Sequence, residues 1–272
     1  MSLHASVKHR LLVRRCFVAL AGVLAFLSFS KALRLPNRWA ATHFVLNYNQ
    51  GFVRRGAVGE AAHTLLGDAA FHYWVFVVFA FLLMGASSWA FVRLARLALA
   101  ERDGELVLRS AVLVFLASPA LVLLVHLVGY LDYLGILFIC VFAAAQAALR
   151  RRWAAYGVGA LAGLVLALIH EAQTLLFMPV VLFILACRAL ALAQRSPAAG
   201  GGAGSLGLGW RTALPLAGVL SVAVTASAYA SLAGDPQRVV ALERWLNERV
   251  DFTLHYGTFR ALKTGSPASL LD

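Results

Sequence analysis

The chain of 272 residues is 61% apolar and only 13% charged, whereas an ordinary soluble domain carries about 25% charged residues. The apolar residues fall in long runs, which excludes an ordinary soluble enzyme and indicates a membrane protein. The net charge of +12 does not indicate a nucleic-acid partner, because the basic residues are spread as short flanks to the apolar runs. The three cysteines form no CxxC pair, so they indicate neither a metal site nor a disulfide framework.

Two apolar runs near the N-terminus predict the first two membrane spans. The first run, 16–35, follows a basic head and ends at Pro36. No signal-peptidase site follows it, so we expect it to be a retained span. The second run, 71–92, begins with aromatic residues typical of a membrane interface. Residues 36–70 between the two runs form the predicted first external loop.

Two longer apolar runs predict helical hairpins. Residues 106–149 exceed the roughly 20 residues that cross a bilayer as one helix. The chain must therefore turn back within this run, and its only polar break is 126–135. Residues 153–193 repeat the arrangement, with a polar break at 170–174.

A linker rich in Gly, Ala and Ser, 194–211, leads to the last predicted span, 212–232. The predicted fold class is all-α, a polytopic transmembrane helix bundle of about seven spans with an extracytoplasmic first loop. Residues 1–233 form this transmembrane helical domain. Residues 234–272 form a predicted extracytoplasmic amphipathic tail, in which 236–250 has the apolar stripe of a helix that lies on the membrane surface.

The basic residues predict the orientation of the bundle. More than half of the 24 lysines and arginines flank the spans on the side of the N-terminus, and the two hairpin tips on the other side hold none. The positive-inside rule therefore predicts a cytoplasmic N-terminus. The opposite side receives four carboxylates and five histidines: Glu60, Asp68, Asp132, Glu171, His43, His63, His72, His126 and His170.

The first external loop contains the stretch N-Y-N-Q-G-F-V-R-R-G-A-V-G-E, residues 47–60. Arg54 and Arg55 stand between glycines there, on the side of the membrane where positive charge is normally avoided. Paired guanidinium groups recognise phosphate or carboxylate through two parallel hydrogen bonds. The stretch therefore predicts an anion site beside the membrane. The alternative is a glycine-rich turn whose arginines contact lipid headgroups.

The two hairpin tips carry further ionisable residues. Asp132 lies between two tyrosines in G-Y-L-D-Y-L-G, and His170-Glu171 interrupts the second long run. A charge at the centre of a spanning helix costs about 2.5–3.5 kcal/mol, so such groups are usually paired, hydrated or functional. The alternative for each tip is a solvated interfacial turn. The H-E pair lacks the second histidine of H-E-x-x-H, so a zinc protease is not indicated.

Together these features resemble the polytopic envelope enzymes that use lipid-linked sugars. The resemblance is to the C-type glycosyltransferase superfamily and to the O-antigen polymerase-like and glucosyltransferase membrane families. It is carried by G-F-V-R-R-G-A-V-G-E in the first loop, by the Asp132 tip and by the H-E pair at 170–171. In that superfamily an acid in the first external loop is the catalytic base. Here only Glu60 and Asp68 match it.

The resemblance implies a glycosyl transfer enzyme that acts on polyprenyl-phosphate-linked sugar at the outer face of a bacterial inner membrane. Arg54 and Arg55 are expected to hold the donor phosphate and stabilise the leaving group. Glu60 is expected to take the proton from the acceptor hydroxyl. No cofactor is expected apart from a divalent metal, and the remaining polar groups are expected to position the sugar or that metal: Asp132, His170 and Glu171.

Two other classes of function stay open from the sequence. Buried ionisable groups also mark the pathway of a transporter or flippase. A non-catalytic membrane subunit or scaffold with a membrane-protein partner is the third class. For this class the helix-packing motif Gly159-x-x-x-Gly163 is the relevant feature, because small residues let helices approach closely.

Overall fold

The computed structural model describes residues 3–99, 113–114, 116–117, 126–149, 151–194, 210–232 and 235–264. Within these ranges every regular element is a helix, which confirms the all-α class for this part of the chain. The elements are α1 (Leu3–Ala32), α2 (Arg38–Val45), α3 (Ala57–Leu66), η1 (Gly67–Phe71), α4 (Tyr73–Leu99), α7 (Asp132–Ala148), α8 (Arg152–Ile169), α9 (Glu171–Gln194), α10 (Trp210–Leu232), α11 (Pro236–Asn247) and α12 (Tyr256–Thr264).

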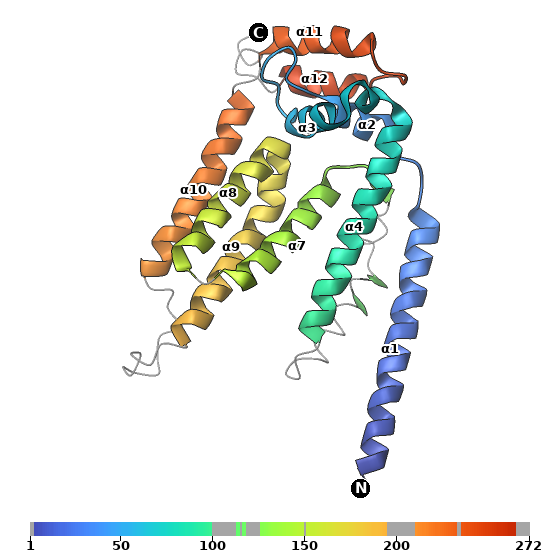
Figure 1. The fold of residues 1–272 in the computed structure, drawn as a ribbon, viewed down its shortest axis with the longest axis vertical. Helices are drawn as coiled ribbons and strands as arrows, with labels where there is room; N and C mark the ends of the chain where they lie inside the picture. The colour runs from blue at the N-terminus through green and yellow to red at the C-terminus, as the bar shows by residue number, and fades with distance from the viewer. Residues whose placement is uncertain are drawn as a thin grey trace.

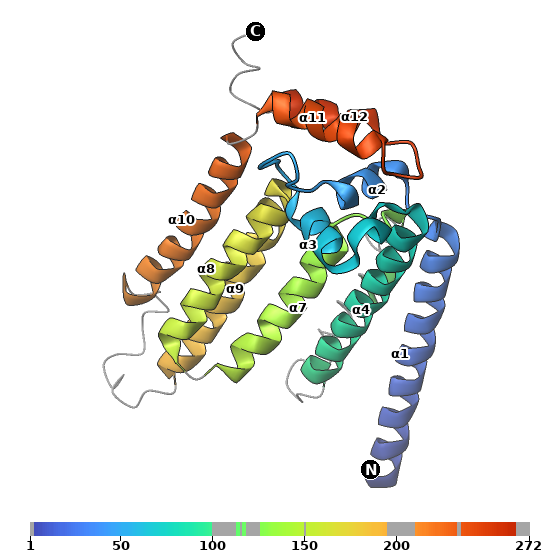
Figure 2. The same cartoon turned by 45° about the horizontal axis from the view of Figure 1, so that its top comes forward.

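The helices form two layers. The long helices α1, α4, α7, α8, α9 and α10 run along one direction, and the short helices lie across one end of them (Figure 1). We call the short helices α2, α3, η1, α11 and α12 the cap. The cap lies at the end opposite the N-terminus of α1, and a second view shows the same separation (Figure 2). The predicted first loop and the predicted tail therefore lie on the same end of the bundle.

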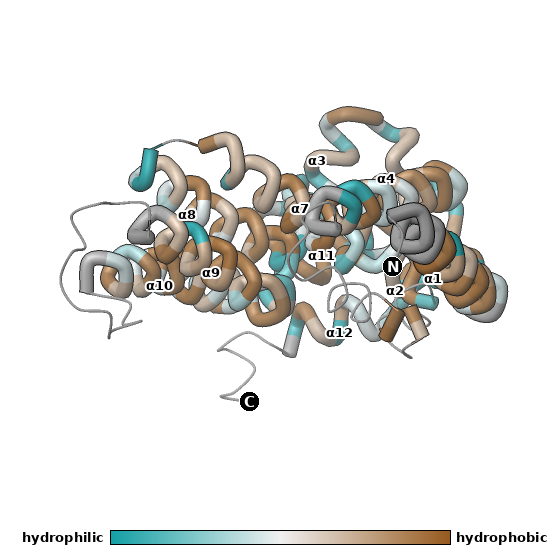
Figure 3. The backbone as a smooth tube through the Cα atoms, turned by 90° about the horizontal axis from the view of Figure 1, so that it is seen from below, coloured by the Kyte–Doolittle hydropathy of each residue, from teal (hydrophilic) through white to brown (hydrophobic). Residues whose placement is uncertain are grey.

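Within the described ranges, four helical segments are long and apolar enough to cross a membrane: Tyr73–Arg96, Arg152–Ile169, Glu171–Ala191 and Thr212–Leu232. Two shorter apolar helical segments accompany them: Arg15–Ser30 and Asp132–Ala148. Apolar residues dominate the long helices when the bundle is viewed along its length (Figure 3). These six segments coincide with six of the seven predicted spans. The remaining predicted span, in 106–125, lies mostly outside the described residues.

Small residues allow close packing at the centre of the bundle. Helix α8 packs against α9 and α10, while α7 packs against α4 and α9. A Cβ added at Gly163 would lie 2.7 Å from the Cβ of Ala223 in α10, and one added at Gly159 would lie 2.7 Å from Leu185 in α9. The predicted packing role of these two glycines is therefore what the helix contacts require.

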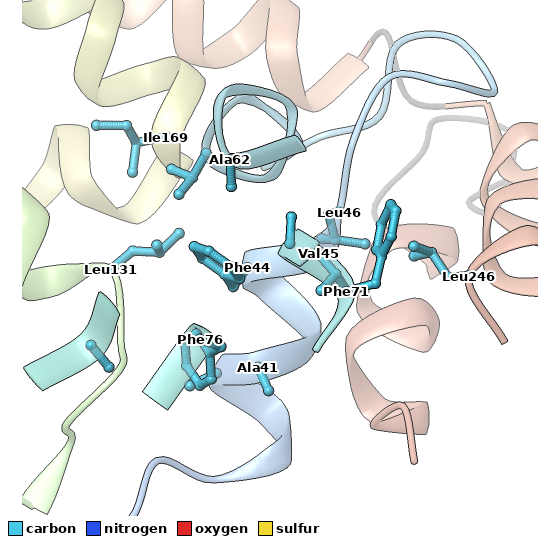
Figure 4. Packing of buried hydrophobic residues seen from close by; sticks show 14 of the residues in the cluster. Ala41, Phe44, Val45, Leu46, Ala62, Phe71, Phe76, Leu131, Ile169 and Leu246 are labelled. Atoms are coloured by element: carbon cyan, nitrogen blue, oxygen red, sulfur yellow. The ribbon is translucent and has the colours of Figure 1, made fainter. Parts of the chain in front are cut away.

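One apolar core joins the cap to the long helices. Phe44 in α2 packs between residues of the cap and residues of the spans, among them Phe76, Leu131 and Ile169 (Figure 4). Phe44 and Phe76 are each 1% exposed. Burying one such side chain contributes about 1.5–3 kcal/mol, so the shared core holds the cap in a fixed position over the ends of the spans.

Two glycines permit the close approaches on which the cap depends. Gly59 lies against the C-terminal end of α2, where an added Cβ would collide with the backbone oxygens of Phe44 and Leu46. Gly129 has a φ of +88°, and an added Cβ would lie 2.8 Å from both Pro36 and Phe76. A residue with a side chain is disfavoured at Gly129 by both its space and its backbone angle.

Several predicted boundaries change in the structure. The first helix ends at Ala32 instead of near residue 35, and 36–70 is largely helical, since it holds α2, α3 and most of η1. The tip of the first hairpin narrows to 127–131, and that of the second narrows to His170 alone. Helix α11 confirms the predicted amphipathic helix, and its stripe is buried: Val239, Leu242 and Leu246. Helix α12 was not predicted.

Candidate functional site

A cavity of about 250 Å³ lies where the cap meets the long helices. Three segments that are distant in sequence line it: α2, the turn before α7, and the joint between α8 and α9. Its lining residues are Trp39, Ala40, His43, Gly129, Tyr130, Leu131, Asp132, His170, Ala172, Gln173 and Leu176. Buried or partly buried ionisable groups in a cavity are candidates for a functional site.

A larger groove of about 770 Å³ lies at the edge of the cap, but its polar groups are more exposed. The carboxylate in this groove, Asp251, already has partners within the protein. The Oδ1 atom of Asp251 accepts a hydrogen bond of 2.8 Å from the backbone N–H of Tyr73, and Oδ2 lies 3.1 Å from Nδ1 of His72. The smaller cavity is therefore the stronger candidate for a site.

The turn before α7 places Asp132 in the cavity wall. Asn37 donates a hydrogen bond of 3.1 Å to the hydroxyl of Tyr130, and Nε of Arg34 donates one of 2.9 Å to the carbonyl oxygen of His126. These bonds tie the turn to the link between α1 and α2. Asp132 then begins α7, where the helix dipole favours a carboxylate. Its Oδ1 accepts a hydrogen bond of 2.7 Å from Nε2 of Gln173.

The second hairpin turns at a single extended residue, His170. Its φ of −170° and ψ of 131° end α8, and its Nδ1 accepts a hydrogen bond of 3.0 Å from the backbone N–H of Ala172. The ring thereby caps the N-terminus of α9. Burial, and next the nearby Arg55, lower the pKa of His170 to about 4, so its ring is neutral near pH 7.

Arg55 and Glu171 form an ion pair beside His170. Nε of Arg55 donates to both carboxylate oxygens of Glu171 at 3.1 Å, and Nη2 donates to Oε1 as well. The two side chains are 12% and 26% exposed, respectively. Nδ1 of His170 lies 3.6 Å from the same carboxylate. The pair joins the first external loop of the prediction to the start of α9.

Arg55 also has an unusual backbone conformation. Its φ of +66° is the only positive value among the described residues other than glycine. The left-handed region costs a residue with a Cβ about 1–2 kcal/mol. Backbone strain of this kind persists where surrounding contacts enforce it, and it is frequent at binding sites. Arg55 lies in a tight turn in which the N–H of Gly56 donates a hydrogen bond of 3.2 Å to the carbonyl oxygen of Val53, and its side chain forms the fork to Glu171.

Arg54 has a different partner from Arg55, although the two are adjacent. Its side chain is 6% exposed, and Nη2 donates hydrogen bonds to the carbonyl oxygens of Ala261 at 3.0 Å and Leu262 at 2.7 Å. These carbonyls lie near the C-terminal end of α12, where a cation is favoured. Burial lowers the pKa of Arg54. The structure therefore gives Arg54 a role in holding the cap together.

The two predicted candidates for the catalytic base do not line the cavity. Glu60 lies in the first turn of α3, and its Oε2 accepts a hydrogen bond of 2.8 Å from the backbone N–H of Tyr48. Asp68 is exposed in η1. Of the four carboxylates expected on this side, Asp132 is the one that forms part of the cavity wall.

His43 is the main residue of the cavity to which the sequence assigned no role. It is 4% exposed, and neither ring nitrogen has a hydrogen-bond partner among the described residues. Its ring centroid lies 5.1 Å from that of Trp39 and 6.0 Å from that of His170. Burial, and next the charge of Arg55, lower its pKa to about 3. The sequence pointed to His43 only as one of the five histidines predicted on the side of the bundle opposite the N-terminus.

The described residues contain no group of three or more His, Cys, Asp or Glu side chains that could hold a metal ion. Asp132, His170 and Glu171 therefore do not fit the divalent metal that the sequence left open. Comparison with protein-family models, curated proteins and solved structures finds no match. Function has to be argued from the chemistry of the cavity.

The cavity combines hydrogen-bonding groups with aromatic surface. A partly buried carboxylate, an amide and two neutral imidazoles face the same space as the rings of Trp39 and Tyr130. None of the described residues that line it is a serine, threonine or cysteine that would act as a nucleophile. Such a set can bind hydroxyl groups and move a proton, with a guanidinium of Arg55 close by.

Proposed function

We propose that this protein is an integral membrane enzyme of the glycosyltransferase kind, acting on polyprenyl-phosphate-linked sugars at the outer face of a bacterial inner membrane. One observation carries the proposal: Asp132 and His170 line a cavity at the cap end of the spanning helices, beside the Arg55–Glu171 pair. A substrate with a sugar head, a phosphate and a lipid tail presents matching groups at this depth.

Asp132 is the best-placed general base for the transfer. The acceptor hydroxyl oxygen forms a bond to C1 of the sugar and gives its proton to the carboxylate of Asp132. The bond between C1 and the phosphate oxygen breaks, and its electron pair leaves with the polyprenyl phosphate. Glu60 is less suited to this role, because its Oε2 is held by Tyr48 and it lies outside the cavity wall.

Arg55 is the best-placed group to stabilise the departing phosphate. Its hydrogen bonds to Glu171 use Nε and Nη2, so Nη1 takes no part in the fork. A phosphate can bind at Nη1 or compete with Glu171 for the fork, since both are charge-assisted acceptors.

The test is the glycan and lipid-linked-sugar profile of a deletion strain complemented by variants. Asp132→Asn keeps the size of the side chain but cannot accept the proton, so transfer should fall by about 10²–10⁴ at normal membrane abundance. The matched control is Asp68→Asn, which neutralises an exposed carboxylate outside the cavity. Wild-type glycan from Asp132→Asn, or its loss in Asp68→Asn alone, would contradict the assignment of the base.

A second candidate is a non-catalytic membrane subunit, and two contacts favour it. Arg54 and Glu60, both expected in the site, are instead bound to backbone groups of the protein. A scaffold would tolerate Asp132→Asn and Arg55→Lys, whereas an enzyme would lose activity in both. Transfer by the purified protein in liposomes, with polyprenyl-phosphate sugar as the donor, would rule out the scaffold.

A further inference from the structure

We propose that the cavity of about 250 Å³ binds a single neutral monosaccharide ring, and that His43 and Gln173 recognise two of its hydroxyl groups. This inference rests on the proposed function, which supplies the idea that the sugar is carried by a lipid. It adds the substrate class that the cavity accepts and the residues that select it. Both residues line the cavity.

The first argument is the presence of buried polar atoms without partners. Both ring nitrogens of His43 and the Oε1 atom of Gln173 are buried and have no hydrogen-bond partner within the described part of the chain. Native structures satisfy nearly all such atoms, so each exception calls for an explanation. Ligand hydroxyl groups supply the missing partners, since each hydroxyl both donates and accepts.

The second argument is the charge of these groups. A neutral imidazole offers one donor and one acceptor, and Oε1 of Gln173 offers a further acceptor. The depressed pKa of His43 keeps its ring uncharged near pH 7. These uncharged groups suit a neutral, hydroxylated ligand better than a phosphate, because a phosphate binds best to cationic side chains. The guanidinium of Arg55 lies beside the cavity and is left for the phosphate.

The third argument is the size and the lining of the cavity. Its volume of about 250 Å³ lies just below the roughly 300–1,000 Å³ of pockets that enclose drug-sized ligands. One pyranose ring fits this space, and a disaccharide exceeds it. The rings of Trp39 and Tyr130 add aromatic surface to the wall, against which the C–H face of a sugar can pack.

The experiment measures sugar binding directly, without any transfer reaction. The full chain in lipid nanodiscs is titrated with methyl glucoside, methyl galactoside, methyl mannoside and maltose, and binding is followed by saturation-transfer NMR and calorimetry. We expect at least one methyl glycoside to bind, and maltose to bind at least tenfold more weakly than that glycoside.

Variants assign the binding to the cavity. His43→Phe keeps an aromatic ring but removes both nitrogens, and should weaken binding about tenfold or more, since each lost hydrogen bond costs about tenfold. The matched control is His63→Phe, which alters a histidine that lies away from the cavity, with its ring 5.2 Å from that of Phe71 and 6.3 Å from that of Trp245. If His43→Phe does not fold, Gln173→Met should weaken binding similarly; it removes the unpaired oxygen, and it also removes the amide that donates to Asp132.

The outcomes separate this inference from the proposed function. No binding of any methyl glycoside, tighter binding of maltose, or wild-type affinity in both cavity variants would overturn the monosaccharide site. Sugar binding that depends on His43 in a protein without transfer activity would support the site and overturn the enzyme. Transfer activity that is unaffected by His43→Phe and Gln173→Met would support the enzyme and overturn the site.

Discussion

Replacing Arg54 by methionine should loosen the C-terminal helix of the cap without touching the cavity. Nη2 of Arg54 donates two hydrogen bonds, to Ala261 at 3.0 Å and to Leu262 at 2.7 Å. Hydrogen bonds from a charged group contribute about 1.5–3 kcal/mol each. The substitution also removes the cost of a buried cation whose Nε has no partner in the part of the chain that the structure describes, which offsets part of this loss.

The net loss is therefore about 2 kcal/mol, which corresponds to a roughly 30-fold larger population of the open form of α12. Hydrogen exchange followed by mass spectrometry reports this population for the amides of α12, Tyr256–Thr264. In micelles or nanodiscs, Arg54→Met should speed exchange there about 30-fold and leave α8 and α9 unchanged.

Arg249→Met is the matched control for this experiment. Arg249 lies just after α11 with its side chain 40% exposed. It donates a hydrogen bond of 3.2 Å to the carbonyl oxygen of Trp245, and its guanidinium lies 4.1 Å from the centroid of the Trp245 ring. Its replacement should leave exchange in α12 within about twofold of wild type, since exposed contacts are weak. Unchanged exchange in Arg54→Met, or equal acceleration in the control, would refute the assignment of Arg54 to the cap.

Three further predictions concern packing, the first-loop acid and pH. Gly163→Leu places a side chain where even a Cβ would lie 2.7 Å from a methyl group of α10. It should lower the free energy of unfolding by about 1–3 kcal/mol, and with it the Tm and the membrane abundance. The control Gly157→Leu faces open space and should lower neither. Glu60→Gln keeps an acceptor for the N–H of Tyr48 and should retain activity; a loss of about 10² at normal abundance would restore Glu60 as the base. In the folded chain the pKa of His43 is lowered to about 3. Between pH 6.5 and 3, therefore, only the unfolded chain binds a proton at this residue. The free energy of unfolding is unaffected by this group above pH 6.5 and falls by up to about 1.4 kcal/mol for each pH unit below it. His43→Phe should reduce that pH dependence of the Tm, while His170, whose pKa is lowered to about 4, still contributes to it. An unchanged slope would contradict the burial of a neutral ring at His43.

Much of the fold follows from patterns that are local in sequence. The long apolar runs predicted the helices of the bundle, because a chain in lipid must satisfy its backbone hydrogen bonds within each segment. The stripe in 236–250 predicted α11, because its apolar residues recur at the helical period. Helix α12 was missed, since it is only 9 residues long and two polar residues, Lys263 and Thr264, close it.

The candidate site was predicted only in part. Asp132, His170 and Glu171 stood out because ionisable residues are rare within long apolar runs, and the structure places all three at the same end of the bundle. His43 did not stand out. It lies in the short helix α2 of the predicted first loop, where a histidine is ordinary, and its burial depends on distant segments that pack around it, such as the joint at His170.

The sequence by itself determined the class of protein, the long apolar helices and the end of the bundle on which the ionisable groups gather. These properties depend on the transfer of side chains and backbone between water and lipid, which is summed along each segment. The tertiary structure decided which group does what. The adjacent residues Arg54 and Arg55 bind to two different segments, each more than 100 residues away in the sequence: Arg54 to Leu262 and Arg55 to Glu171. Hydrogen bonding and burial of a side chain depend on distant segments that pack around it, so no local pattern distinguishes the two.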